Sequence, residues 1–154
     1  MEIIEIYILC KNRSKKLVFE FLDKFLPNRE ASAEEYPYPE YVDQPEHVYS
    51  DVAELMAVLD SNEDESYSLY WDSTDNAKVK NAMVFYTVDG GLIVGIAVED
   101  DHREAWLNKL SNLVGGEFGY VSFEMPPPET VQEFIEYSEK SDQVRLISGN
   151  IVKG

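Results

Sequence analysis

The sequence predicts an α+β fold, in which helices pack mainly on one face of a mixed or antiparallel sheet. Three observations lead to this prediction. Apolar runs with strand and helix periodicity follow one another in the order β-α-α-β-β-β-α-β-α-β. The two glycines after Asp89 separate two apolar runs, as in an antiparallel hairpin. Hydrophobic residues make up 44% of the 154 residues, which is enough for the core of one domain spanning residues 1–154.

The first two elements are a strand and a helix. Residues 3–9 form a nearly continuous apolar, β-branched run, which is typical of a strand covered on both faces. Apolar residues then recur at helical spacing from a start near Ser14 to a stop at Pro27-Asn28. The predicted helix stripe consists of Leu17, Val18, Phe21, Leu22, Phe25 and Leu26.

A long acidic loop rich in proline and tyrosine is expected at about residues 30–48. Pro37, Pro39 and Pro45 exclude a regular helix or an inner strand there, and long loops in compact domains tend to be functional or disordered. Ser50 is the expected cap of a second helix. The inward positions of that helix are Val52, Leu55, Met56 and Leu59.

Strands dominate the second half of the chain. A tight turn with positive φ at Asp89–Gly91 is expected to join two of them. Asp101 is the expected cap of a third helix, with Glu104 as its capping-box partner and Gly115-Gly116 at its end. The expected strands are at about 66–72, 82–89, 91–99, 118–124 and 144–147, and the last helix carries Val131, Phe134 and Ile135.

Charge and composition argue against several classes of protein. The net charge is −17, from 30 acidic and 13 basic residues, so direct nucleic-acid binding is not expected, because phosphates would be repelled. No apolar run approaches the ~20 residues of a membrane span, and the first ten residues lack the basic region and cleavage site of a signal peptide. The single cysteine, Cys10, cannot form an internal disulfide, which fits a reducing compartment. We therefore expect a cytoplasmic protein.

The most unusual feature of the chain is an acidic-aromatic segment, residues 30–77. Its 48 residues hold 14 carboxylates, six of the ten tyrosines and Trp71, but no lysine or arginine. Charge of one sign interleaved with rigid rings can attract a basic protein and then bind it. The alternative is a solvated acidic face with a tyrosine-containing loop packed on its own core. The candidate partner-binding residues are Glu34, Glu35, Tyr36, Tyr38, Glu40, Tyr41, Asp43, Asp64, Glu65 and Trp71.

Cys10 is the first candidate for chemistry, because it precedes a helix and several cations that would lower the pKa of a thiol. However, the phosphatase-type Cys-x5-Arg pattern fails, since position 16 is lysine. The thioredoxin-type pair fails as well, since position 13 is arginine. We therefore expect a buried structural cysteine.

Metal and catalytic motifs are equally incomplete. Residues 60–66 begin like a calcium-binding loop. However, Glu65 occupies the position that requires glycine, and Trp71 occupies the twelfth position, which requires a bidentate glutamate. A solvated linker is therefore expected. Neither His47 nor His102 belongs to a His-x-x-x-His or Glu-x-x-His pattern, the spacings at which metal ligands occur on a helix. His102 is expected to be a neutral surface imidazole. We predict no catalytic residue, no metal and no cofactor.

The hairpin region carries a resemblance to a known family. The run Ala82–Ile96, preceded by Tyr70-Trp71 and followed by Glu124–Pro128, resembles small immunity proteins of bacterial polymorphic toxin systems. The similarity covers about residues 66–136 and consists of hairpin and core positions. It implies an acidic cytoplasmic α+β domain that neutralises a toxin of the same or a sibling cell. The implied mechanism is a non-enzymatic inhibitor whose acidic face covers a basic active site, often that of a nuclease.

Two functions from different classes therefore follow from the sequence. The first is a protein-binding inhibitor of the immunity type, with a basic protein as partner. The alternative is a small enzyme or ligand-binding domain whose site lies between the sheet and the 30–48 loop. A cavity with convergent polar groups and a perturbed pKa would favour the alternative. A structural or regulatory subunit is a third possibility that the sequence does not distinguish.

Overall fold

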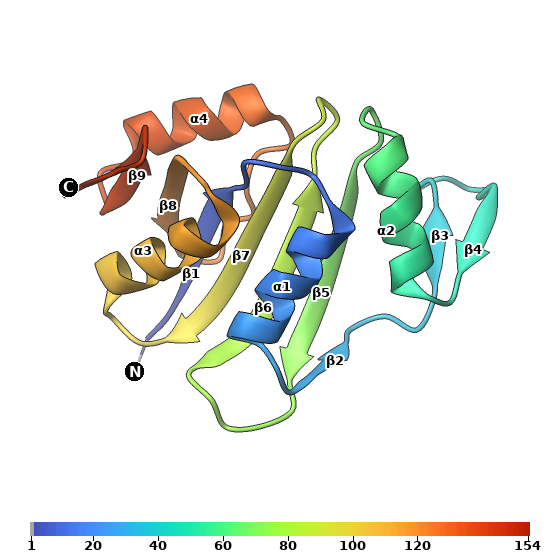
Figure 1. Ribbon diagram of the computed structural model, residues 1–154, viewed down its shortest axis with the longest axis horizontal. Coiled ribbons are helices and arrows are strands. Elements are labelled where there is room, and N and C mark those ends of the chain that lie inside the picture. Colours follow the sequence, from blue (N-terminus) through green and yellow to red (C-terminus); the bar gives the residue numbers. More distant parts are fainter. Residues whose placement is uncertain (1) are drawn as a thin grey trace.

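The computed structural model describes residues 2–154, which form one large sheet, a small sheet and four helices (Figure 1). Eight strands make the large sheet in the order β10-β9-β8-β1-β7-β6-β5-β2, with every neighbouring pair antiparallel. The helices are α1 (Lys15–Phe25), α2 (Val52–Ser61), α3 (Arg103–Val114) and α4 (Val131–Lys140). The strands are β1 (Ile3–Leu9), β2 (Arg29–Ala31), β3 (Tyr36–Tyr38), β4 (His47–Tyr49), β5 (Tyr67–Ser73), β6 (Val79–Tyr86), β7 (Leu92–Glu99), β8 (Phe118–Ser122), β9 (Arg145–Ile147) and β10 (Asn150–Val152). The α+β prediction is confirmed.

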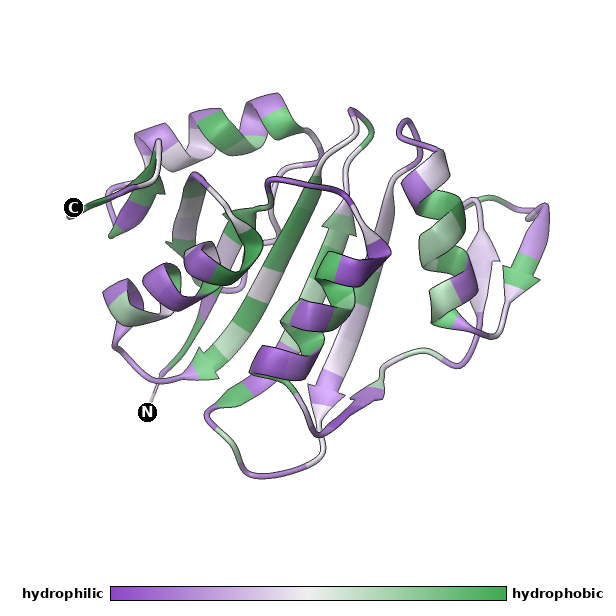
Figure 2. Ribbon diagram, viewed as in Figure 1, coloured by the Kyte–Doolittle hydropathy of each residue, from purple (hydrophilic) through white to green (hydrophobic). Residues whose placement is uncertain are grey.

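The central strands are apolar on both faces because both faces of the sheet are covered. β1 pairs with β7 on one side and with β8 on the other. β7 also pairs with β6, so the predicted hairpin lies next to β1 as expected. Figure 2 shows hydrophobic residues concentrated along β7, whereas β2 at the sheet edge is hydrophilic.

The sheet separates two hydrophobic cores. Ile4, Ile6 and Ile8 of β1 belong to the core on one face, together with residues of α1, α2 and α3. Tyr7 of the same strand packs with Tyr120 and Phe134 on the opposite face, which α4 covers. Three of the four helices therefore lie on one face, in agreement with the prediction, and α4 lies on the other.

The hairpin turn is wider than the tight turn predicted at Asp89–Gly91. The paired strands end at Tyr86 and resume at Leu92, so residues 87–91 form the connection. Gly90 has the expected positive φ, 86°. The Thr87 hydroxyl accepts a hydrogen bond from the Gly91 amide at 2.7 Å, which closes the wider loop. The Thr87 amide also donates to the Gly91 carbonyl at 3.1 Å, so a backbone and a side-chain hydrogen bond close the connection together.

The predicted loop at residues 30–48 contains three short strands instead of irregular backbone alone. β2 extends the edge of the large sheet, while β3 and β4 pair with each other beside α2 (Figure 1). The prolines allow this because Pro37 lies in a two-stranded sheet, where one side of each strand needs no ladder hydrogen bond.

The helix starts are only partly as predicted. Ser14 caps α1, as expected, by accepting a hydrogen bond from the Leu17 amide at 3.2 Å. Asp51, and not Ser50, caps α2, because its carboxylate accepts from the Ala53 amide at 2.9 Å. Serine and aspartate are both favoured at the N-cap, so which of the two neighbouring residues caps the helix depends on the backbone that precedes it.

The capping box predicted at Asp101 and Glu104 does not form. The residue before α3 is His102, and its side chain makes no capping bond. The buried Asp100 carboxylate accepts from the amides of His102 and Asp101 at 3.0 and 2.7 Å. The hydrogen bond from the His102 amide is the largest of the effects that hold the pKa of Asp100 well below its usual range.

The chain ends in a hairpin and not in the single strand predicted at 144–147. β10 pairs with β9 through a turn in which Ser148 and Gly149 both have positive φ, 50° and 82°. The Ser-Gly dipeptide was the available signal, since two-residue primed turns need this conformation. β9 lies within the predicted strand, whereas β10, with three residues, is too short to show a periodicity.

Arg13 joins three segments at one end of the large sheet. Its guanidinium lies over the Tyr86 ring, 4.9 Å from the ring centre. Since α2 has no basic residue in its last turn, Arg13 also supplies the positive charge that the carbonyl end of a helix favours. The guanidinium donates, at 2.9–3.4 Å, to the carbonyl oxygens of Leu59, Asn62, Glu63, Glu65, Thr87 and Gly91.

A glycine is required in the middle of β7. Gly95 lies opposite Tyr7 of β1 and Met83 of β6, and a Cβ atom there would come within 2.5 Å of the buried Tyr7 ring. We expect Gly95→Ala to lower the free energy of unfolding by ~1–3 kcal/mol, because overpacking displaces a buried ring. Urea unfolding followed by circular dichroism measures this change. An unchanged urea midpoint would contradict the prediction.

Candidate functional site

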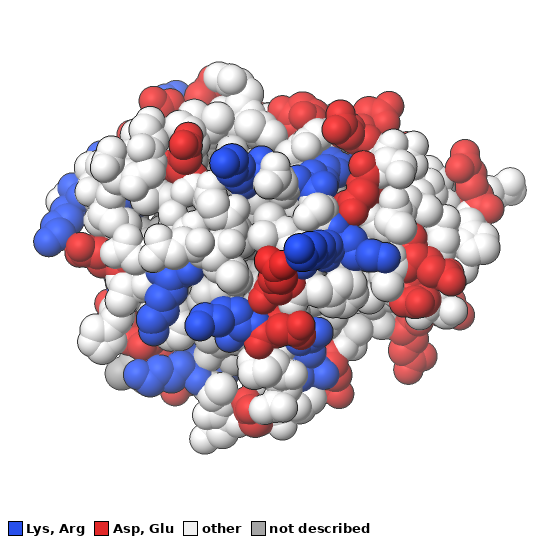
Figure 3. Space-filling model, viewed as in Figure 1, with Lys and Arg blue, Asp and Glu red and all other residues white. Residues whose placement is uncertain are grey.

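The acidic-aromatic segment folds into the part of the molecule formed by β2, β3, β4, α2 and β5. Figure 3 shows Asp and Glu gathered over the α2, β3 and β4 end of the molecule, while Lys and Arg gather mainly over α1 and α3. Of the ten predicted partner-binding residues, five are exposed, two are half-buried and three are buried. The exposed ones are Glu34, Glu35, Tyr41, Asp43 and Asp64; Glu40 and Glu65 are half-buried; Tyr36, Tyr38 and Trp71 are buried.

Three of the predicted aromatic anchors belong to the hydrophobic core of their own domain. Tyr36, Tyr38 and Trp71 are only 7%, 8% and 4% exposed. Trp71 points to the helix-covered face, as does every second residue of β5. The alternative given above, rings packed on the core, therefore holds for these three residues, and they are not free to contact a partner.

Tyr41 is the predicted ring that remains available. It is 90% exposed and its backbone has a φ of 61°. A positive φ is an outlier for a bulky side chain and costs of order 1–3 kcal/mol, and such strain clusters at functional sites. The fold thus holds a large apolar ring in solvent on a strained backbone.

A groove lies beside Tyr41, between β5 and the segment that contains β3. Its volume is about 240 Å³. One wall is the edge of β5 and the other is the 30–48 segment, which is where the alternative function placed a site. The lining residues are Ser32, Ala33, Glu35, Tyr36, Pro37, Glu40, Tyr41, Tyr67, Ser68, Leu69 and Tyr70.

Glu40 is held in this groove by the part of the β5 edge that β2 does not cover. One of its oxygens, Oε1, accepts a hydrogen bond from the Ser68 amide at 3.1 Å, where a neighbouring strand would otherwise pair. Burial raises the pKa of Glu40 to about 7, against the lowering effect of that amide. A half-buried carboxyl with a perturbed pKa in a groove is a functional-site candidate.

The other walls of the groove are fixed by internal contacts. The Tyr67 hydroxyl donates to the Pro37 carbonyl at 2.7 Å, and the Tyr36 hydroxyl donates to the Ala33 carbonyl at 3.3 Å. The Tyr70 ring meets the Phe85 ring edge-on, with 5.8 Å between the ring centres. Three tyrosines are therefore rigid, and only Tyr41 projects freely.

Tyr67, Ser68 and Tyr70 were missed as candidate site residues. The alternation along β5 contains the signal that would have found Tyr70. Apolar side chains at 67, 69 and 71 face the helices, so Tyr70 faces the other side and is 47% exposed. The Ser68 contact had no signal in the sequence, because it depends on a residue 28 positions away.

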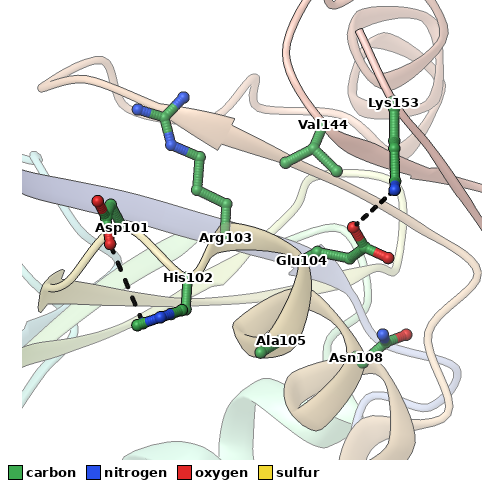
Figure 4. Close-up of a pocket in the computed structure, with 8 residues that line it drawn as sticks. All are labelled: Asp101, His102, Arg103, Glu104, Ala105, Asn108, Val144 and Lys153. Carbon is green, nitrogen blue, oxygen red and sulfur yellow. Dashed lines mark ion pairs between the residues drawn. The ribbon is translucent and has the colours of Figure 1, made fainter.

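A larger hollow of about 620 Å³ lies at the start of α3, and none of the predicted partner-binding residues lines it (Figure 4). Lys153 and Glu104 form an ion pair across it, at 3.7 Å. Arg103 extends away from the other lining residues and donates to Gln143 at 2.7 Å. The charged groups of this hollow thus pair with neighbours, which suits a surface depression and not a reaction site.

Within residues 2–154, one group of side chains has the spacing to hold a metal ion, namely Asp100, Asp101 and His102. Asp100 is already occupied, because it accepts from two amides, from Trp106 Nε1 at 3.2 Å and from Lys78 Nζ at 3.3 Å. Its Oδ1 also lies 2.5 Å from His102 Nδ1, so His102 is at the surface, as expected, and its ring contacts the Asp100 carboxylate. These contacts fix the start of α3.

Cys10 is buried, as predicted. Burial raises the pKa of its thiol, so the thiol stays protonated at neutral pH. Arg13, one of the cations that could have activated it, is engaged by the carbonyls of α2 and the hairpin turn. None of the helices in residues 2–154 has the length and apolar run needed to cross a bilayer.

No protein-family model, curated protein or solved structure matches this chain.

The raised pKa of Glu40 predicts a pH-dependent stability. The folded carboxyl binds its proton more tightly than the unfolded one, whose pKa is near 4.5, so stability should fall as the pH rises from about 4.5 to about 7. Glu40→Gln is neutral throughout and should be more stable than the wild type at pH 8 but not at pH 4. Thermal unfolding at both pH values measures the difference. Glu5, whose pKa burial also raises, contributes equally to both proteins. Subtracting the unfolding temperature of the variant from that of the wild type at each pH therefore removes its contribution.

If the two proteins keep the same difference in unfolding temperature at both pH values, Glu40 ionises normally and the groove does not perturb it.

Proposed function

We propose that this chain is a non-enzymatic protein-binding module, an inhibitor of the immunity type that covers a basic protein with its acidic-aromatic face. The observation that carries this proposal is the charge distribution. The segment from residue 30 to residue 77 has 14 carboxylates and no lysine or arginine, and Figure 3 shows Asp and Glu gathered over its α2, β3 and β4 part. Such a surface steers a cationic partner and raises its association rate.

Two further observations support a protein as the partner. Tyr41 offers an exposed ring of the kind that dominates binding energy at interfaces. The resemblance to immunity proteins implies that the basic partner is a toxin, of which a nuclease is the example. We place the protein in the cytoplasm, because its one cysteine is buried and the resemblance implies that compartment.

Charge reversal tests the proposal. Glu34, Glu35 and Asp43 are exposed, and no ion pair involves them within residues 2–154, so lysine at all three should not disturb the fold. The variant should associate roughly tenfold more slowly with a basic protein captured by the wild type, and its rate should depend less on salt. Stopped-flow association at low and high salt measures both.

A matched control makes the same change in net charge elsewhere. Lysine at the exposed positions Glu99, Glu117 and Glu139 lies outside the acidic-aromatic segment and should slow association much less. Equal slowing by the two triple variants would show that net charge alone matters, and the proposed face would be rejected.

The groove favours a second candidate function, a small enzyme or ligand-binding domain. The specific observation is the half-buried Glu40 carboxyl with a pKa of about 7 beside four tyrosines. However, about 240 Å³ is less than the roughly 300–1,000 Å³ of pockets for drug-sized ligands. The other lining groups with a shifted pKa are Tyr36, Tyr67 and Tyr70, and their raised pKa keeps these phenols neutral. Among residues 2–154, no histidine, cysteine or lysine lines the groove to act with Glu40 in acid–base catalysis.

A further inference from the structure

The groove between β5 and the 30–48 segment has the dimensions and lining for one side chain. A volume of about 240 Å³ suits a single long side chain better than a whole small ligand. Four tyrosines and two carboxylates, Glu35 and Glu40, line it, and none of its lining residues is basic. The lining is therefore aromatic and negative, which favours a cation with a flat or apolar body.

We propose that this groove receives one arginine side chain of the basic partner, with its guanidinium against the Tyr41 and Tyr70 rings and between the carboxylates of Glu40 and Glu35. The inference rests on the proposed function, because it names the group by which a basic partner is recognised. It also assigns a role to Glu40 that charge steering alone does not require.

The shape of the guanidinium decides for arginine over lysine. A guanidinium is planar and stacks on aromatic faces while it donates several hydrogen bonds in the ring plane. Two ring walls and two carboxylates offer both kinds of contact in one groove. An ammonium is a strongly hydrated point charge and would use the rings less well.

The contacts around Glu40 leave it ready for such a cation. Its Oε1 accepts from Ser68, whereas Oε2 accepts no hydrogen bond within residues 2–154. The wall residues are already ordered, since Phe85 holds Tyr70 and Pro37 holds Tyr67. Binding would therefore lose little conformational entropy beyond that of the arginine itself and of Tyr41.

The Glu40 carboxylate must also be desolvated in the groove, and a residue with a purely structural role would not need that charge. The amide of Ser68 could be satisfied by a neutral glutamine in the same place, without a charge to desolvate. The other titratable groups that face Glu40 are Glu35, Tyr36, Tyr41, Tyr67 and Tyr70. Since burial raises the pKa of Tyr36, Tyr67 and Tyr70, those three phenols stay neutral at pH 8.

The experiment is an NMR titration of the isotope-labelled chain with N-acetyl-arginine methylamide at low salt. At pH 8 we expect saturable shifts at the amides of Tyr41, Ser68 and Tyr70. The citrulline analogue, which has the same shape without the charge, should give none. Because Glu40 is mostly protonated at pH 5.5, affinity there should be at least about tenfold weaker than at pH 8.

Two variants locate the effect. Glu40→Gln should weaken binding of the arginine probe about tenfold and abolish its pH dependence, since a charge-assisted contact is lost. Tyr41→Ala should weaken it several-fold with the pH dependence intact. Glu139→Gln, on α4, is the matched control and should change neither.

The outcomes separate this inference from the proposed function. Equal shifts with the arginine and citrulline probes, or undiminished binding in Glu40→Gln, would overturn the arginine site. Charge reversal on the acidic face would still slow association if the proposed function holds. Tighter binding of the lysine analogue than of the arginine probe would also overturn the assignment to arginine. Conversely, the arginine probe can bind even if charge reversal leaves partner association unchanged, and that result would reject only the proposed function.

Discussion

Arg13→Met should lower the free energy of unfolding by about 2–4 kcal/mol, because it removes the donor that satisfies carbonyls in three segments. Methionine keeps much of the apolar stem over the Tyr86 ring but cannot donate. The carbonyls of Leu59 and Thr87, which are bound at 3.0 and 2.9 Å, would then lose their partner. Urea unfolding measures the change.

Two controls separate the guanidinium from its charge. Arg13→Lys keeps the charge but cannot reach α2, the residue 62–65 linker and the hairpin turn together, so it should recover less than half of the loss. Lys16→Met removes a charge three residues further along the chain, in the first turn of α1. Its side chain is 88% exposed, so the variant should change stability by less than ~0.5 kcal/mol. Full recovery by lysine would show that charge near the α2 terminus is sufficient.

The linker between α2 and β5 shows what a sequence pattern leaves open. The incomplete calcium motif predicted a solvated linker at residues 60–66. In the structure its backbone carbonyls converge on Arg13, and Asp60 accepts from the Lys15 amide at 2.7 Å. Side chains that bind backbone carbonyls far along the chain have no spacing rule, so this contact could not be predicted.

Elements with a strong period were predictable, and elements defined by one or two residues were not. The apolar run of β1, the stripe of α1 and the hairpin of β6 and β7 follow from period and turn residues alone. Four three-residue strands, β2, β3, β4 and β10, were not predicted, because three residues are too few to show a period; the fifth, β9, lies within the strand predicted at 144–147. They form because a neighbouring strand offers free hydrogen-bonding groups.

The candidate site divides in the same way. The acidic character of the surface follows directly from composition, since carboxylates remain in solvent wherever the chain folds. Composition does not show which aromatic rings are exposed, because a tyrosine in a charged segment can pack inward or outward. Strand alternation would have separated Trp71 from Tyr70. For Tyr38 and Tyr41 the outcome depends on whether α2 and the small sheet cover the ring.

Tyr38 and Tyr41 provide the second large prediction, because they are three residues apart and lie in opposite environments. Tyr38 is 8% exposed and meets Tyr49 edge-on, with 6.2 Å between ring centres. Tyr38→Ala should lower the free energy of unfolding by about 3 kcal/mol, as expected for a buried aromatic ring. Tyr41 is 90% exposed, so Tyr41→Ala should leave stability within ~0.5 kcal/mol of the wild type.

The same pair should separate in the opposite sense when binding to a basic partner is measured. Tyr41→Ala should speed dissociation, at a cost of ~2 kcal/mol for an aromatic anchor, whereas folded Tyr38→Ala should dissociate at nearly the wild-type rate. Surface plasmon resonance below the unfolding temperature of both variants compares the two rates. If Tyr41→Ala dissociates like the wild type, the exposed ring is no anchor. Partner binding would then depend on the carboxylates alone, and its affinity should vanish at high salt.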